Sequence, residues 1–110
     1  MAGGNKGGGG GGPVRARSTG CDVYEETDVQ SPDAEVAETV KPRDTLHVEL
    51  VSEGRARLRA VTCEKKVLGG LIPASLPRIV KCIREEGVVY VADVIKKDGG
   101  RIRVLIRNAH

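Results

Sequence analysis

Two segments of this chain place arginine on every second residue, and this alternation constrains the fold more than any other feature. Between Arg55 and Ala60, and again between Arg101 and Arg107, the arginines are separated mainly by small or apolar residues. Because successive side chains of a strand point to opposite faces, a period of two predicts strands with one apolar and one cationic face. We therefore expect a sheet whose apolar face forms the core and whose arginine-bearing face is exposed.

Each arginine-rich strand is expected to be the second strand of a hairpin. Glu53 and Gly54 form the first predicted turn, and Asp98 and Gly99 form the second. A regular alternation precedes the first turn, whereas an almost wholly apolar run typical of a central strand precedes the second. The four expected strands span residues 46–50, 55–62, 88–95 and 101–107.

Between the hairpins the sequence predicts one helix at residues 76–86. Ser75 is a candidate N-cap, Pro77 is tolerated in the first turn, and Gly87 provides the C-terminal stop. Four apolar residues fall on one helical face, at Leu76, Ile79, Val80 and Ile83. The predicted fold is therefore α+β, with a small, mainly antiparallel sheet or partly open barrel and one helix in the order ββαββ.

The first 42 residues differ in composition from the rest, and we expect them to form a disordered tail before a small domain at 43–110. Residues 1–20 are rich in glycine, and the segment from Asp22 to Glu38 contains seven acidic residues and no basic one. Such a composition buries too little apolar surface to offset the loss of chain entropy. Residues 34–40 are expected to form a transient helical turn. The acidic segment either competes with an anionic ligand for the sheet or serves as a solubilising linker.

The two parts of the chain also differ in charge. Residues 44–110 contain thirteen Lys and Arg against eight Asp and Glu, whereas residues 1–43 contain five against seven. Because like charges on neighbouring strands repel one another, a cationic sheet face suggests an anionic partner that neutralises it. If the two arginine strands share a sheet, this face is predicted to bind nucleic acid, either DNA or RNA. The candidate contact residues are Arg55, Arg57, Arg59, Lys65, Lys66, Lys96, Lys97, Arg101, Arg103 and Arg107.

Two other interpretations of the sheet stay open. The arginines could form a solvated polar face opposite the core. Alternatively, the domain could bind a protein partner, with an exposed edge strand that accepts a partner's strand and the acidic tail as a docking peptide. Tyr90 lies within an apolar strand, so we expect it in the core rather than stacked on a base.

No motif in the sequence indicates catalysis, and we predict that the protein is not an enzyme. Gly7–Gly12 lack the Gly-Lys-Ser/Thr ending and the preceding strand of a phosphate-binding loop. His47, Cys63 and Cys82 are scattered, without the spacing of a metal site or of a nucleophile and its base. No catalytic residue, cofactor or metal is therefore expected.

The cysteines and the apolar segments bear on localisation. Cys21, Cys63 and Cys82 fit neither a disulfide framework nor a zinc motif, so we expect reduced thiols, those at 63 and 82 buried and inert. Glycine replaces the apolar run of a signal peptide, and no apolar stretch reaches the length of about 18 residues that spans a bilayer. A cytoplasmic or nuclear protein without a membrane partner is the expectation.

Residues 66–107 resemble the second half of a HIRAN domain. The resemblance rests on the sequence Leu68–Pro73, the predicted helix, Gly87 and the strand rich in Val and Ala that follows. In that family a strand ends in a Gly-x-x-Pro-type turn, and a short helix and further strands complete a small barrel-like fold. The resemblance implies a non-enzymatic module that binds single-stranded DNA ends, often joined to chromatin-remodelling or DNA-repair enzymes. Residues 44–65 show no counterpart of the family's first half, so its end-binding positions cannot be assigned.

Overall fold

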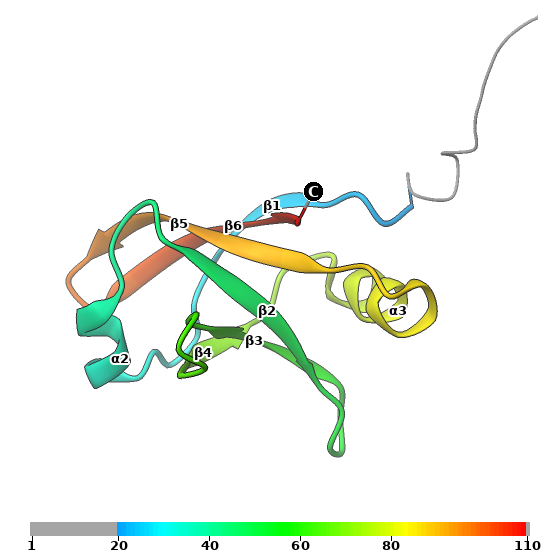
Figure 1. Ribbon diagram of the computed structural model, residues 1–110, viewed down its shortest axis with the longest axis horizontal. Helices are drawn as coiled ribbons and strands as arrows, with labels where there is room; N and C mark the ends of the chain where they lie inside the picture. Colours follow the sequence, from blue (N-terminus) through cyan, green and yellow to red (C-terminus); the bar gives the residue numbers. More distant parts are fainter. Residues whose placement is uncertain (1–19, 110) are drawn as a thin grey trace, which may run out of the picture.

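The computed structural model describes residues 20–109, which form one antiparallel six-stranded sheet and two helices (Figure 1). The strand order in the sheet is β1-β6-β5-β2-β3-β4. The predicted disorder of the glycine-rich residues 1–19 lies outside the described residues. In chain order the elements are β1 (Tyr24–Asp28), α2 (Ala34–Thr39), β2 (Thr45–Val51), β3 (Arg57–Val61), β4 (Val67–Leu71), α3 (Leu76–Glu86), β5 (Tyr90–Asp98) and β6 (Arg101–Asn108).

The sheet curls into a half-barrel, and the chain beyond β1 joins its two edge regions. The backbone N–H of Val29 donates to the carbonyl of Ile102 on β6 at 2.9 Å, and Gln30 exchanges two hydrogen bonds with Gly70 on β4, at 2.8 and 3.1 Å. A Cβ atom at Gly69 would lie 2.6 Å from the carbonyl oxygen of Gln30. Glycine is therefore required at position 69 for this close approach of the two backbones.

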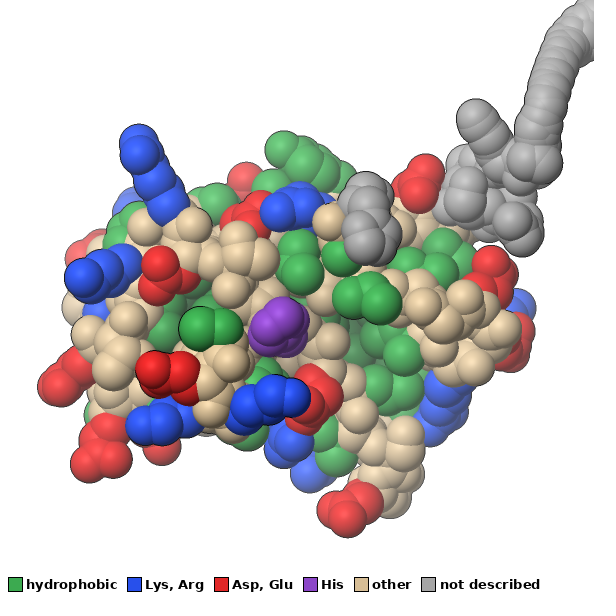
Figure 2. All heavy atoms as spheres, in the orientation of Figure 1, with side chains coloured by type: hydrophobic (Ala, Val, Ile, Leu, Met, Phe, Trp, Pro, Cys, Tyr) green, Lys and Arg blue, Asp and Glu red, His purple; other side chains and the backbone are tan. Residues whose placement is uncertain are grey.

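The predicted alternation of the arginine strands is confirmed. Leu58 and Ala60 of β3, and Ile102, Val104 and Ile106 of β6, are fully or almost fully buried. The arginines between them are exposed or half-buried on the opposite face of the sheet. On the surface seen in Figure 2, basic and acidic side chains are interspersed.

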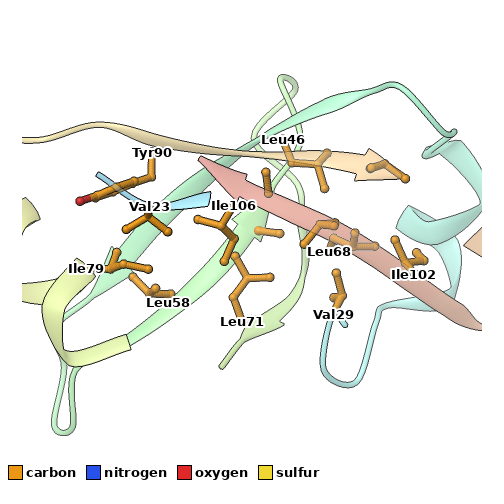
Figure 3. Close-up of a cluster of buried hydrophobic side chains, with 14 of the residues drawn as sticks. Val23, Val29, Leu46, Leu58, Leu68, Leu71, Ile79, Tyr90, Ile102 and Ile106 are labelled. Carbon is orange, nitrogen blue, oxygen red and sulfur yellow. The ribbon is translucent and has the colours of Figure 1, made fainter. Parts of the chain in front are cut away.

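The core is aliphatic and contains one tyrosine, as Figure 3 shows. Ile79 of α3 lies beside Leu58 of β3 and near Tyr90 of β5, so the helix covers one end of the half-barrel. The predicted core position of Tyr90 is confirmed, since its side chain is 1% exposed. Its hydroxyl donates to the carbonyl of Cys21 at 2.5 Å, and burial raises its pKa.

Helix α3 spans the predicted residues, but its N-terminus is satisfied differently. Gly87 adopts a left-handed conformation with φ of 64°, and its N–H donates to the carbonyl of Ile83 as expected for a C-terminal stop. Ser75 makes no side-chain capping bond. Instead, the carboxylate of Glu25 on β1 accepts the backbone N–H groups of Ala74 and Ser75, at 2.5 and 3.2 Å. A distant carboxylate therefore holds the two residues that precede the helix, whereas the serine predicted as its cap makes no capping bond.

The predicted order ββαββ is wrong, since the described chain has the order βαβββαββ. Strand β4 is absent from the predicted order, because its Gly69 and Gly70 are residues that strands disfavour. These glycines instead pair with β3 on one side and approach residues 29–32 on the other. The segment expected to turn transiently is helix α2, whose N-cap Asp33 accepts the N–H of Val36 at 3.0 Å. There are thus two helices in the described residues, where one was predicted.

The expectation of disorder is also wrong for residues 20–42, so the domain begins well before residue 43. Strand β1 pairs with β6 along its whole length. Val23, Val29 and Val40 belong to the buried core. The prediction of disorder from composition treats carboxylates as solvated charges, whereas in the fold several of them have hydrogen-bonding partners.

The expectation of reduced thiols is wrong for Cys21 and Cys82, and the expectation of burial is wrong for Cys63. Cys21 and Cys82 form a disulfide with a Cα–Cα distance of 5.8 Å, and Cys63 is free and exposed. The bonded cysteines are 61 residues apart in sequence. The spacing of the cysteines in the sequence does not predict this pair, because the two cysteines meet only when the chain before β1 packs against α3.

Replacing Ile79 with alanine is expected to destabilise the domain by about 2 to 5 kcal/mol, because its side chain is fully buried between the helix and the sheet. Ile83 is only half-buried, so the loss for Ile83→Ala should be smaller. Urea unfolding of the two variants, followed by circular dichroism, measures both losses. A larger loss for Ile83→Ala would contradict this packing of α3.

Candidate functional site

The two arginine-bearing strands are in one sheet but are not neighbours. Strands β5 and β2 lie between β6 and β3. The strands that carry the outward arginines are therefore three strand spacings apart, which is about 14 Å. The sheet has no continuous arginine surface of the kind on which the predicted nucleic-acid interface was based.

Three of the outward arginines are paired with carboxylates from neighbouring strands. Arg59 pairs with Glu49 of β2. Arg103 donates to Glu26 and Asp28 of β1, both at 3.0 Å, and these contacts raise its pKa. Arg107 donates to Asp93 of β5 at 2.6 Å. The hydrogen bond from Arg107 lowers the pKa of Asp93, and the same bond raises the pKa of Arg107.

Positive and negative charges are also balanced over the whole described part of the chain. All fifteen Asp and Glu lie within residues 20–109, whereas three of the eighteen Lys and Arg, at positions 6, 15 and 17, precede them. Residues 20–109 therefore carry fifteen charges of each sign and no net charge. The predicted basic character of the folded part does not hold, because the acidic segment belongs to the fold.

The remaining predicted contact residues lie at separate places. Lys97 donates to the carbonyls of Ala37 and Val40, at 2.5 and 3.0 Å, and so binds the C-terminal end of α2. A hollow of about 90 Å³ at the β5–β6 hairpin includes side chains of both signs, among them Lys96 and Arg101. The other predicted contact residues are exposed at the start of β3 and in its two flanking loops, at Arg55, Arg57, Lys65 and Lys66.

Strand β2 leaves part of its edge open. It pairs with β5 only from Thr45 to His47, and then the two strands diverge. The N–H of Val94 on β5 donates to the carbonyl of Asp44, so by the two-residue period the amide groups of Val48 and Leu50 also face this side. The ladder ends with the pairing of His47 and Val91, which places the N–H of Val48 on the carbonyl of Tyr90. Beyond this point, no strand of residues 20–109 pairs with the carbonyl of Val48 or with the N–H and carbonyl of Leu50. We call this stretch of β2, residues 48–51, the open edge.

Apolar side chains accompany the open edge. Val48 and Leu50 point toward the core side of the sheet, yet they are only half-buried. On α3, Val80 and Ile83 are likewise half-buried. Figure 2 shows hydrophobic side chains exposed between the histidine of β2 and helix α3, and Figure 1 shows β2 and β5 diverging there. The open edge was not located from sequence because its residues alternate like those of any half-buried strand.

A polar hollow lies near the start of β2. Its volume is about 490 Å³, and Asp44, Cys63 and Glu64 are among its lining residues. Asp44 already accepts the backbone N–H of Lys41 at 2.9 Å. In the part of the chain that the structure describes, no three His, Cys, Asp or Glu side chains are grouped to hold a metal ion.

Comparisons with protein-family models, with curated proteins and with solved structures give no match. The resemblance of residues 66–107 to the HIRAN domain therefore stays a prediction. Among the described residues, neither helix is long and apolar enough to cross a membrane.

The ion pair of Asp93 predicts a dependence of stability on pH. Because the folded-state pKa of Asp93 is below its ordinary value of 3.8, its stabilising contribution is present above about pH 4 and is lost as the pH falls through the folded-state pKa. The difference in melting temperature between the natural protein and Asp93→Asn should therefore shrink between pH 5 and pH 2. A difference that stays constant over this range would mean that the ion pair does not contribute.

Proposed function

We propose that the domain is a non-catalytic binding module that accepts an extended segment of a partner protein at the open edge of β2. The observation that carries the proposal is the coincidence of free backbone groups and half-exposed aliphatic side chains at Val48 and Leu50. A partner strand uses both features, because backbone hydrogen bonds give affinity and alternate side chains give specificity. An edge that lacked either feature would be a weaker candidate.

The surroundings of the open edge limit what fits there. At one end, β5 already occupies the edge as far as the N–H of Val48. Along the side, α3 contributes Val80 and Ile83. The carbonyl of Val48 and the N–H and carbonyl of Leu50 remain, so a bound segment gains up to three backbone hydrogen bonds. A short extended segment with aliphatic side chains at alternate positions meets these conditions.

Nucleic-acid binding stays a prediction from the arginine alternation, and salt distinguishes it from strand addition. Binding to phosphates weakens linearly with salt on a logarithmic scale, by about 0.7 to 0.9 per contact, whereas strand addition is nearly insensitive. The absence of net charge on residues 20–109 and the pairing of Arg59, Arg103 and Arg107 favour the protein partner. Titration of labelled DNA and RNA at two salt concentrations tests the nucleic-acid alternative directly.

Selection from a displayed library of random octapeptides, followed by amide NMR of the domain, tests the proposal. We expect recovered peptides to shift the amide signals of Val48–Val51 and of residues 80–83. N-methylation of the peptide at alternate residues facing β2 should abolish binding, and methylation at the intervening residues should not. Failure to recover any binding peptide, or shifts confined to another surface, would overturn the proposal.

A further inference from the structure

We infer that the segment bound at the open edge carries a carboxylate that pairs with Arg84 of α3. This inference rests on the proposed function and adds the chemical class of the partner: an extended, aliphatic segment with an acidic group at one end. The observations that support it concern the place of Arg84, its lack of an ion-pair partner and the orientation of the acids near it.

Arg84 lies at one end of the open edge. Its Nη2 atom is 3.5 Å from the side-chain oxygen of Ser52, the residue that directly follows β2. This distance is at the limit of a hydrogen bond, so most of the five N–H donors of the guanidinium remain free. A strand added along Val48–Val51 would end beside these donors. A carboxylate at that position can accept two parallel hydrogen bonds from one guanidinium.

In the described part of the chain, Arg84 lacks the ion pair that three arginines of the outer face form, and so do Arg57 and Arg101, which lie on the outer face away from α3. Arg59, Arg103 and Arg107 each pair with a carboxylate, whereas no carboxylate of residues 20–109 forms an ion pair with Arg84. Its exposed guanidinium is carried on an eleven-residue helix. A positioned cation without an internal partner at the end of a free strand edge is complementary to an acidic end of the bound segment.

The nearby acids do not remove this complementarity. Glu85 and Glu86 follow Arg84, but each residue of a helix is rotated by about 100° from the one before it, which turns both away from the side of Ser52. Glu53 lies in the exposed turn after Ser52, and Arg55 in the same turn has the opposite charge. Lys81, one turn earlier on α3, is exposed and adds a further positive charge near Arg84.

Octapeptides of alternating valine and serine test the inference. Three are capped at both ends: one is neutral, a second has glutamate at its N-terminal end, and a third has glutamate at its C-terminal end. A fourth has no glutamate, and its C-terminal carboxylate is free. We expect at least one acidic peptide to bind about tenfold more tightly than the neutral one, because hydrogen bonds to an ionised carboxylate are stronger than those between neutral groups. Comparison of the two glutamate peptides with the fourth peptide shows whether Arg84 binds a side-chain carboxylate or a terminal one.

Two variants of α3 test whether Arg84 is the residue responsible for the preference. Arg84→Gln should remove the preference for the acidic peptide and leave the affinity for the neutral peptide unchanged. Arg78→Gln is the matched control, because Arg78 is an exposed arginine of α3 that contacts Ser75 rather than Ser52. Equal affinities for neutral and acidic peptides would overturn the inference and leave the proposed function standing. Loss of binding of all four peptides, with amide signals of Val48–Val51 unshifted, would overturn both.

Discussion

A chain that begins at residue 43 is expected not to fold. Truncation there removes β1 and α2, together with the buried Val23, Val29 and Val40. Burial of each valine contributes about 1.5 to 3 kcal/mol, and a domain of this size has only about 5 to 15 kcal/mol in total. The truncation also exposes the whole edge of β6. Far-ultraviolet circular dichroism with thermal melting measures the result, which should lack a cooperative transition.

A chain that begins at residue 20 is the control for this truncation. It retains Cys21, both helices and all six strands of the described part. We expect it to melt cooperatively, within a few degrees of the full chain. A cooperative transition for residues 43–110 alone would instead restore the domain boundary that composition predicted.

Loss of the crosslink in the Cys21→Ser, Cys82→Ser double variant is expected to lower the free energy of unfolding by about 4 kcal/mol. The bond closes a loop of 61 residues, and in the chain-entropy account a loop of this length restricts the unfolded chain by about that amount. Urea unfolding of the double variant under non-reducing conditions measures the loss. Cys63→Ser should leave stability nearly unchanged, because Cys63 is exposed and unbonded.

Thiol counting gives an independent check of the crosslink. In the natural protein under native, non-reducing conditions, one thiol per chain should react with an alkylating reagent, and after unfolding and reduction three should react. Three reactive thiols without reductant in the unfolded chain would show that the cysteines are reduced. The stability of the double variant would then have no reason to differ from that of the natural protein.

Sequence patterns located the elements whose determinants are local. Helix α3 was predicted from its apolar face and from Gly87, and its observed bounds agree with the prediction. The hairpin turns were predicted from Gly54 and Gly99, and both glycines have positive φ. In each case a few adjacent residues restrict the backbone enough to specify the structure.

The elements that sequence patterns missed depend on distant partners. The sequence of β1 contains Glu25 and Glu26 and is typical of solvated chain. In the fold, Ser75 at the start of α3 and Arg103 of β6 donate hydrogen bonds to these carboxylates. Strand β4 contains Gly69, which has no strand propensity of its own and is required by the approach of residues 29–32. No local pattern encodes either contact.

The same distinction applies to the candidate site. The alternation of the arginines correctly placed them opposite the core. It did not reveal that Glu49, Asp93 and the acids of β1 would pair with three of them, because ion pairing depends on strand order. The open edge of β2 could not be predicted from the sequence either, because it results from the divergence of β2 and β5.

The pairing of β1 with β6 has a consequence for how the domain is made. These strands are nearly the first and the last structured parts of the described chain, and a hydrogen bond between Val23 and Asn108 joins residues 85 positions apart. Contacts of such long range form slowly, because a large loop must close before they stabilise anything. During synthesis β1 has no strand partner until residue 108 has left the ribosome. Folding of this domain is therefore expected to be completed only after translation of its last strand.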